Sequence, residues 1–299
     1  MAPEKISFYD QASKNKMQSV LLIVIVFMGL IAIGWLIGTI FTPDIAYTFI
    51  IIAVIIAVLS TWVGYYYSDS IVLSATNAKP ANDAEHKRVI NLIEGLSIGS
   101  GMPMPRIYII ESSDINAFAT GRNPEHAVIG VTKGALEKLN KDELEGVLAH
   151  ELSHIRNYDI LFMTLVATIV GMVVLLSEFF LRSFRFQRKD NDRGGVGLIL
   201  IAVGIIFAVL APFFMKLAQL AVSRRREYLA DASAAEITRY PDGLAGALDK
   251  IKEYNKGRMQ VSRSVEHLFI SNPFKARGLI NLFSTHPPID ERIKVLRAM

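Results

Sequence analysis

Two long apolar segments near the start of the sequence constrain the fold more than any other feature. No charged residue stands between Lys16 and Asp44, and a second uncharged segment runs from Ile45 to Ser68. Each is long enough to cross a hydrocarbon core, which takes about 20 helical residues. Their short connection predicts a helical hairpin in the membrane, and a composition that is 52% hydrophobic with a mean hydropathy of +0.35 agrees.

Charge gives this hairpin an orientation. Lys5, Lys14 and Lys16 precede the first segment, whereas the turn has no lysine or arginine. Since positive charge stays on the cytoplasmic side, we expect the N-terminus and the chain after Tyr67 in the cytoplasm. We expect a retained anchor and not a signal peptide, because no small-residue cleavage site separates the segments. The net charge is +4, and most clusters of charged residues flank the apolar segments. This placement is typical of membrane topology, so the expected partner is the lipid bilayer and not nucleic acid.

The composition of residues 69–159 is polar enough to predict a part of the chain that lies outside the membrane, in water. The pattern over 79–101 predicts an amphipathic helix that ends at glycines. β-Branched residues predict short strands at 106–112 and 126–134, separated by a segment at 115–125 that is rich in turn-forming residues. The soluble part therefore combines helices with a small β-sheet.

A further helix, predicted to begin at Asn140, carries the sequence His150-Glu151-Leu152-Ser153-His154. Residues four apart lie on one helical face, so both imidazoles can reach one ion. Glu151 lies beside that ion, where it can hold a water, take its proton and pass it to a leaving amine. A solvated helix with incidental histidines is the alternative. An apolar face on the same helix argues against it, formed by Leu144, Val147, Leu148 and Leu152.

A catalytic zinc site takes three protein ligands, and without cysteine the third must be a histidine or a carboxylate. Glu227 stands in an arginine-rich helical segment, with Asp231 four residues later on the same face. One carboxylate can bind the ion while the other accepts the N–H of a ligating histidine. We predict His150, His154 and Glu227 as ligands of one Zn²⁺ and Asp231 as their support, although cobalt or manganese would also suit these ligands. The alternative is that Glu227 pairs with arginines on a wet helix face.

The two motifs together resemble the gluzincin pattern, and the chain is similar to the HtpX-type proteases of the M48 metallopeptidase family. The resemblance covers nearly the whole chain, including 115–121, 149–159, 223–235 and 285–293. It implies a mainly helical α+β membrane protein that has a zincin-like catalytic domain, a small β-sheet and four apolar transmembrane-type helices. It also implies an ATP-independent zinc endopeptidase of the cytoplasmic membrane that cleaves misfolded or damaged membrane proteins in protein quality control.

We divide the chain into an N-terminal anchor of two spans (1–68), a first cytoplasmic part of the catalytic domain (69–159), a second apolar hairpin (160–222) and a second cytoplasmic part with the third ligand (223–299). Both ligand sets must lie on one side of the membrane, because metal–ligand bonds near 2 Å leave no slack. If the second hairpin spans, the loop 182–195 is external, although its basic residues oppose the positive-inside rule. The alternative is a hairpin that enters the membrane partly or packs on the protein.

The resemblance also gives roles to weaker positions. His286 matches a recurring histidine that stabilises an oxyanion or binds substrate near the zinc, and it is equally a loop histidine beside two prolines. Asn116 and Ala117 match an edge strand whose backbone binds an extended peptide, although Asn116 is as readily a turn residue. Asp159 is similar to a family carboxylate, or else it pairs with an arginine. The remaining histidines are expected at the surface: His86, His126 and His267.

Two other functions are open to a chain with this motif. In an intramembrane site-2-type protease the histidine helix lies in the bilayer with an aspartate ligand. Asp242 fits superficially, but Lys141 and Arg156 make the helix too polar for a bilayer centre. In a non-catalytic membrane scaffold the zinc would be structural and would need a fourth ligand, for which His286 is the candidate.

Overall fold

The structure is a computed structural model, and it describes residues 8–41, 46–171, 224–255, 257, 259, 261–273 and 287–299. Most of the predicted hairpin 160–222, its loop 182–195 and the candidate residue His286 lie outside the described residues.

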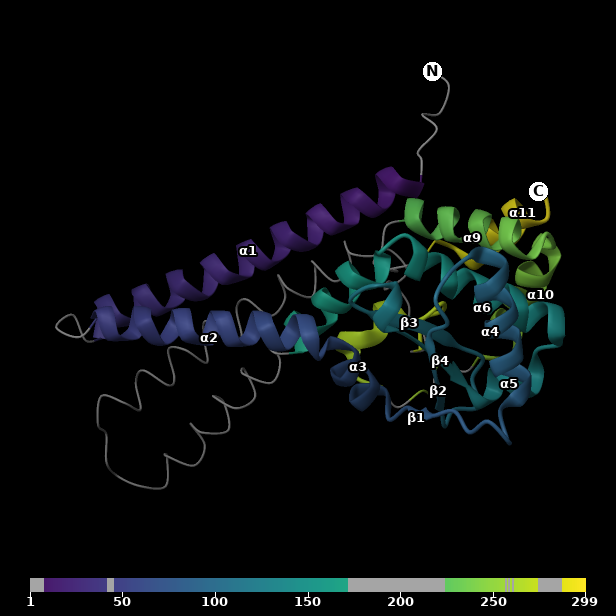
Figure 1. Cartoon of the computed structure of the whole chain (residues 1–299), viewed down its shortest axis with the longest axis horizontal. Coiled ribbons are helices and arrows are strands. Elements are labelled where there is room, and N and C mark those ends of the chain that lie inside the picture. The colour runs from purple at the N-terminus through teal and green to yellow at the C-terminus, as the bar shows by residue number, and fades with distance from the viewer. Residues whose placement is uncertain are drawn as a thin grey trace, which may run out of the picture.

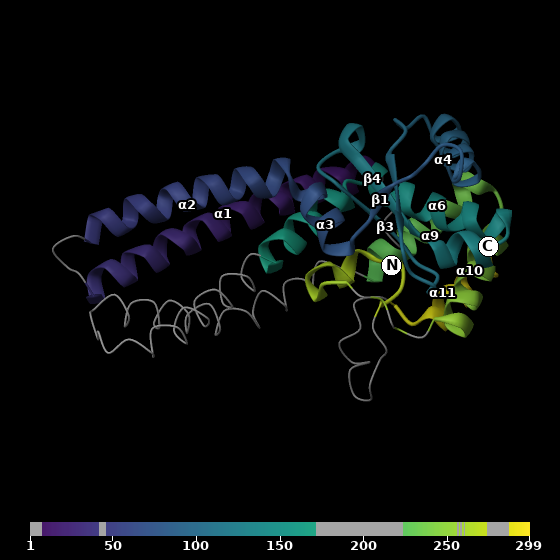
Figure 2. The ribbon, with the colours of Figure 1, turned by 90° about the horizontal axis from the view of Figure 1, so that it is seen from below.

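The predicted N-terminal hairpin is present. Helices α1 (Phe8–Phe41) and α2 (Ala46–Tyr66) pack side by side and project from the rest of the molecule (Figures 1 and 2). By length and composition, the stretch Gln11–Ala32 could cross a membrane. The apolar stretches Val54–Tyr66 and Asp159–Gly171 are shorter. One of the four predicted spans thus meets this criterion within the described part of the chain.

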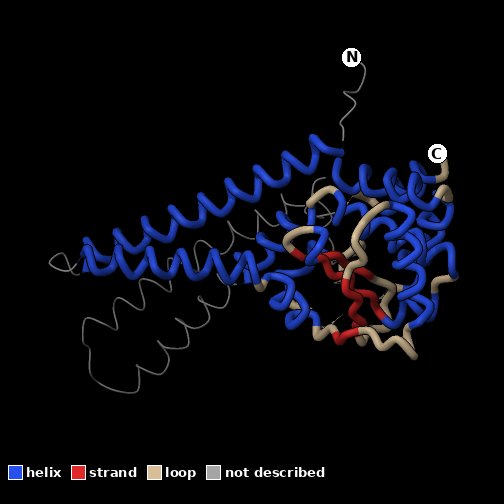
Figure 3. The backbone as a smooth tube through the Cα atoms, viewed as in Figure 1, coloured by secondary structure: helices blue, strands red, loops and turns tan. Residues whose placement is uncertain are grey.

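The strands form a small mixed sheet in the order β1-β2-β4-β3, and helices surround it (Figure 3). β2 runs parallel to β4, whereas β3 is antiparallel to β4 and β1 is antiparallel to β2. The predicted strands at 106–112 and 126–134 are confirmed as β2 and β4. In chain order, β1 to β4 are Lys79–Pro80, Arg106–Ile110, Ala117–Gly121 and Ala127–Thr132.

The prediction that 115–125 separates the strands as a turn-rich segment is wrong for its middle, which is β3. All five residues of β3 are buried, so tertiary packing outweighs the local turn signal. The turn itself is short and follows Gly121, whose φ of 134° favours glycine. The ring of Phe118 lies over Gly130 of β4, in the space that a side chain at Gly130 would occupy.

The helices around the sheet mostly begin and end where local signals place them. α4 (Lys87–Ser100) is the predicted amphipathic helix, and it ends at Gly101, whose φ is 67°. It begins later than predicted, because Lys79–Pro80 pairs with β2. The others are α3 (Ser68–Thr76), α5 (Lys133–Lys138), α9 (Arg224–Thr238), α10 (Pro241–Tyr254), the 3-10 helix Arg263–Leu268 and α11 (Ile289–Leu296).

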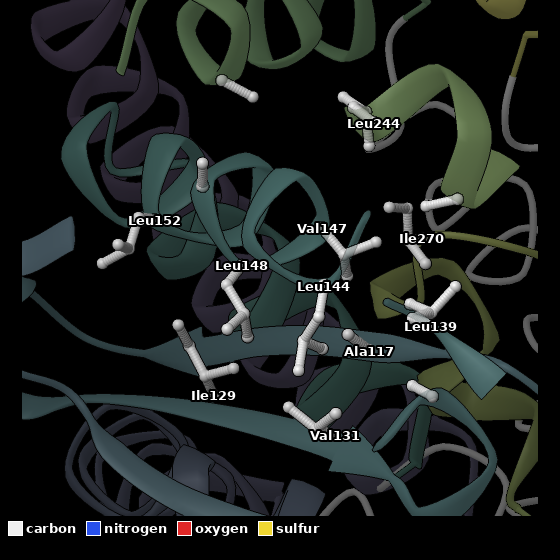
Figure 4. Close-up of a cluster of buried hydrophobic side chains, with 14 of the residues drawn as sticks. Ala117, Ile129, Val131, Leu139, Leu144, Val147, Leu148, Leu152, Leu244 and Ile270 are labelled. Atoms are coloured by element: carbon white, nitrogen blue, oxygen red, sulfur yellow. The ribbon is translucent and has the colours of Figure 1, made fainter. Parts of the chain in front are cut away.

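Helix α6 (Lys141–Arg156) lies at the centre of the core. It begins at Asn140, whose side chain accepts from the Glu143 backbone while Glu143 bonds back, which makes a capping box. Its predicted apolar face is buried and packs toward Ile129, Val131 and Ala117 of the sheet (Figure 4). α9 and α10 also pack on α6. The alternative of a solvated histidine helix is therefore wrong.

Candidate metal centre

Helix α6 presents both histidines of the predicted site. His150 and His154 lie one turn apart, and their rings meet edge to face with centroids 4.8 Å apart. Their Nε2 atoms are 3.2 Å apart. Their side chains are 1% and 7% exposed, so the pair lies inside the protein and not on a helix surface.

Helix α9 packs on α6 (Figure 1). It brings Glu227 to the two imidazoles. Glu227 Oε1 lies 3.6 Å from His154 Nε2, and Oε2 lies 3.9 Å from His150 Nε2. The carboxylate is 2% exposed, so the alternative of an arginine pair on a wet helix face is wrong. The folded chain thus brings the carboxylate and both imidazoles together.

The three side chains fit a tetrahedral ion. Ligand atoms about 2.0–2.1 Å from zinc stand roughly 3.3 Å apart in a tetrahedral site. One ligand atom of each residue lies within 4.8 Å of the others, so small side-chain adjustments suffice. Two imidazoles and one carboxylate form a donor set of catalytic zinc sites, in which the remaining position is open.

A carboxylate lies close to the Nδ1 atom of each imidazole. Asp159 Oδ2 lies 3.0 Å from His154 Nδ1 in a hydrogen bond. Asp231 Oδ1 lies 3.0 Å from His150 Nδ1. Carboxylates in these positions fix the ring orientation and raise the basicity of a ligating histidine. Asp159 also lies 3.6 Å from Arg226, so the predicted contact with an arginine is present.

Sequence reasoning missed Arg292, which is fully buried beside these carboxylates. Its Nε and Nη2 atoms donate to the two oxygens of Asp231 at 2.8 and 2.7 Å. Its Nη1 lies 3.5 Å from Glu227 Oε2. One sequence signal could have found it, because Arg292 lies on the apolar stripe of α11 with Ile293 and Leu296.

Glu151, between the two histidines on α6, is the candidate residue for proton transfer. It is 1% exposed, and neither carboxylate oxygen has a hydrogen-bond partner among the described residues. Burial raises the pKa of Glu151 to about 7, and the charge of Glu227 adds to the effect. A carboxyl group with a pKa near the operating pH can both accept and return a proton.

The two imidazoles differ in charge when no ion is bound. Burial lowers the pKa of His150 to about 4, which keeps this ring neutral. Burial also acts against charge on His154, but the hydrogen bond to Asp159 and the charge of Glu227 outweigh it and raise its pKa to about 9. A metal ion must therefore displace a proton from His154.

The residues predicted to contact substrate lie at the start of β3. Asn116 is buried, and its amide donates to the backbone oxygen of Ser271 at 2.9 Å. The N–H of Ile270 donates to the oxygen of Ala117 at 3.0 Å, and Phe118 forms an antiparallel bridge with Phe269. The segment 269–271 thus occupies the outer edge of β3 at Asn116 and Ala117.

Other candidate residues lie apart from this centre. The prediction that His267 lies at the surface is wrong, because it is 2% exposed and its Nε2 lies 3.0 Å from the oxygen of Met163. Asp242 is exposed in the first turn of α10 and does not belong to the metal-binding group found among the described residues. His286 lies outside the described residues.

Comparison with known proteins agrees with this geometry. A family model for peptidase family M48 matches residues 83–299. A protease HtpX homolog of Thermoanaerobacter pseudethanolicus is 43% identical over 299 residues, which cover 98% of each chain. Another from Pyrococcus furiosus is 44% identical and covers 90% of each chain. The crystal structure of S. mikatae Ste24p shares the fold, with a TM-score of 0.51 at 21% identity, over 96% of this chain and 67% of that one.

Proposed function

The chain belongs to peptidase family M48, and on that premise we propose that it is a zinc endopeptidase whose ion is held by His150, His154 and Glu227. It is a membrane metalloprotease, and polypeptides are its substrates. The observation that carries the proposal is the convergence of two imidazoles and a carboxylate from α6 and α9 within 4.8 Å.

We propose Glu151 as the general base. A bound zinc ion lowers the pKa of a coordinated water toward neutrality. Glu151 accepts the proton of the attacking water on its carboxylate and returns it to the leaving amine. Its burial supports this role, because burial raises the pKa of Glu151 to about 7 in the ion-free protein, where neither protonation state is strongly preferred at neutral pH.

Asp159 and Asp231 are proposed to orient the ligands. Each carboxylate lies 3.0 Å from the Nδ1 atom of one imidazole, which leaves both Nε2 atoms available to hold a zinc ion. Arg292 pairs with Asp231 and approaches Glu227, so that its buried positive charge offsets the negative charge of these carboxylates.

Strand β3 is proposed to bind the substrate backbone, with Asn116 and Ala117 at its start. An extended peptide that pairs with a sheet edge is held by main-chain hydrogen bonds, which makes few demands on its sequence. Pairing at Ala117 requires its oxygen to exchange the N–H of Ile270 for that of the substrate. We further propose that His286 contributes to substrate or oxyanion binding.

For the cellular setting we propose four spans, a catalytic site that faces the cytoplasm, and unfolded or damaged membrane proteins as substrates. The four-part division at 1–68, 69–159, 160–222 and 223–299 belongs to the same proposal. The apolar α1–α2 hairpin that projects from the catalytic part supports a site close to the membrane surface (Figure 1).

Glu151→Gln tests the chemistry separately from the metal. The amide keeps the size of the side chain but cannot take a proton, so we expect hydrolysis of casein to fall by about 100-fold or more while one zinc ion per chain remains bound. His154→Ala is the matched variant that should lose the ion. Full activity in Glu151→Gln would contradict the assignment of the base. Stoichiometric zinc in an inactive wild-type protein would instead indicate a structural site in a membrane scaffold.

A further inference from the structure

The first turns of α1 carry a polar face that the proposed chemistry does not use. Gln11, Asn15 and Ser19 follow one another at four-residue spacing and are 8%, 0% and 1% exposed. They lie in the stretch Gln11–Ala32, which is otherwise apolar enough to cross a membrane. Polar groups in such a stretch are costly unless partners satisfy them, so their contacts indicate what this face does.

Asn15 contacts the turn that follows α6. Its Nδ2 atom donates to the backbone oxygen of Asn157 at 2.8 Å and to Oδ1 of Asp159 at 2.6 Å. Its Oδ1 atom accepts from Gln11 Nε2 at 3.2 Å. Since both the oxygen and the nitrogen of the amide are hydrogen-bonded, the orientation of the Asn15 side chain is fixed.

That turn needs support, because it contains a strained residue. Tyr158 has a φ of 57°, a left-handed conformation that is unfavourable for a non-glycine residue. The ammonium group of Lys16, which follows Asn15, lies 3.9 Å from the centre of the Tyr158 ring. Helix α1 thus contacts three successive residues, 157–159, at the point where the chain turns Asp159 back toward α6.

Asp159 connects this contact to the metal centre. One of its oxygens accepts from Asn15, and the other lies 3.0 Å from His154 Nδ1. A second contact reaches α9, since Gln18 Oε1 accepts from Arg226 Nη2 at 3.0 Å. Arg226 directly precedes Glu227, so the base of α1 bridges the two helices that carry the proposed ligands.

We propose that Asn15 is a positioning residue of the metal centre: it orients the Asp159 carboxylate that holds His154, and so lets the membrane helix set the affinity for the ion. The inference rests on the proposed ligand set. Loss of an outer partner of a ligating histidine weakens metal binding roughly 10- to 100-fold. Asn15 acts one step further out, so we expect zinc binding about tenfold weaker in Asn15→Leu.

The test uses the full-length protein in detergent. The zinc dissociation constant is measured by competition with a chromogenic chelator, and the unfolding temperature is measured without metal. Asn15→Leu removes the amide at nearly constant volume. Ser19→Ala is the matched control, because its hydroxyl is buried on the same face and donates to the backbone oxygen of Asn15, within α1. We expect weaker zinc binding in Asn15→Leu and none of this loss in Ser19→Ala.

A double-mutant cycle separates positioning from general packing. Since Asn15 acts through Asp159, Asn15→Leu should weaken zinc binding no further in the Asp159→Asn background. Unchanged affinity in Asn15→Leu, an equal loss in Ser19→Ala, or additive losses in the double variant would each overturn the proposal. If Asn15→Leu does not fold, Asn15→Ala carries the same cycle. Failure of the ligand set itself has a different signature, namely wild-type zinc affinity in His154→Ala.

Discussion

Replacing Arg292 with methionine tests how the charges around the metal centre are held. The guanidinium is fully buried and donates to both oxygens of Asp231 at 2.8 and 2.7 Å. It lies 3.5 Å from Glu227 as well. Its charge lowers the pKa of the Asp231 carboxyl despite burial, which alone would raise it. Methionine fills similar space but leaves a buried carboxylate without its cation.

The expected loss is large. Removing one partner of a buried ion pair costs about 3–5 kcal/mol. For a folded unit of about 200 residues, each kcal/mol shifts the unfolding temperature by roughly 2–4 °C, so we expect Arg292→Met to lower it by roughly 6–20 °C. Arg297→Met is the matched control, directly after the last residue of α11. Arg297 pairs with Asp249, but both side chains are exposed, and such pairs contribute below about 1 kcal/mol.

Thermal unfolding is followed by circular dichroism in detergent with EDTA, so that bound metal does not contribute to stability. Asp231→Asn in the Arg292→Met background should recover part of the loss, because a neutral amide no longer needs the cation. An Arg292→Met protein as stable as the wild type would refute the reasoning, as would an equal loss in Arg297→Met.

Three further predictions concern the same region. Because the ion-free pKa of His154 is about 9, zinc binding releases its proton. The apparent affinity measured by chelator competition should therefore be about fiftyfold weaker at pH 7 than at pH 9, and a flat profile would contradict the role of Asp159. Glu227→Ala should weaken zinc binding more than His286→Ala, and equal losses by metal analysis would mean that the ligand set is misassigned. Asn116→Asp should lower the unfolding temperature, because the carboxylate cannot replace the amide donor to the segment beside β3. A raised KM at unchanged stability would instead identify a direct substrate contact.

Local patterns in the sequence determined much of this centre. The spacing of His150 and His154 places both rings on one face of any helix, because i and i+4 are neighbours in every α-helix. The capping signal at Asn140 and the periodic apolar residues fixed where α6 begins and which face it buries. The same spacing rule places Glu227 and Asp231 on one face of their helix.

Only the tertiary structure decided which residues from distant parts of the chain come into contact at this centre. It brings Glu227 of α9 within 3.6–3.9 Å of the imidazoles, and no local rule fixes the distance between helices far apart in the chain. It makes Ala117–Gly121 a buried strand where local preference indicated a turn. It also buries Arg292 and Asn15 against the two carboxylates behind the histidines. A polar side chain is solvated or buried with a partner depending on which segments pack over it. Those segments are distant in the chain, so the local sequence around the residue does not identify them.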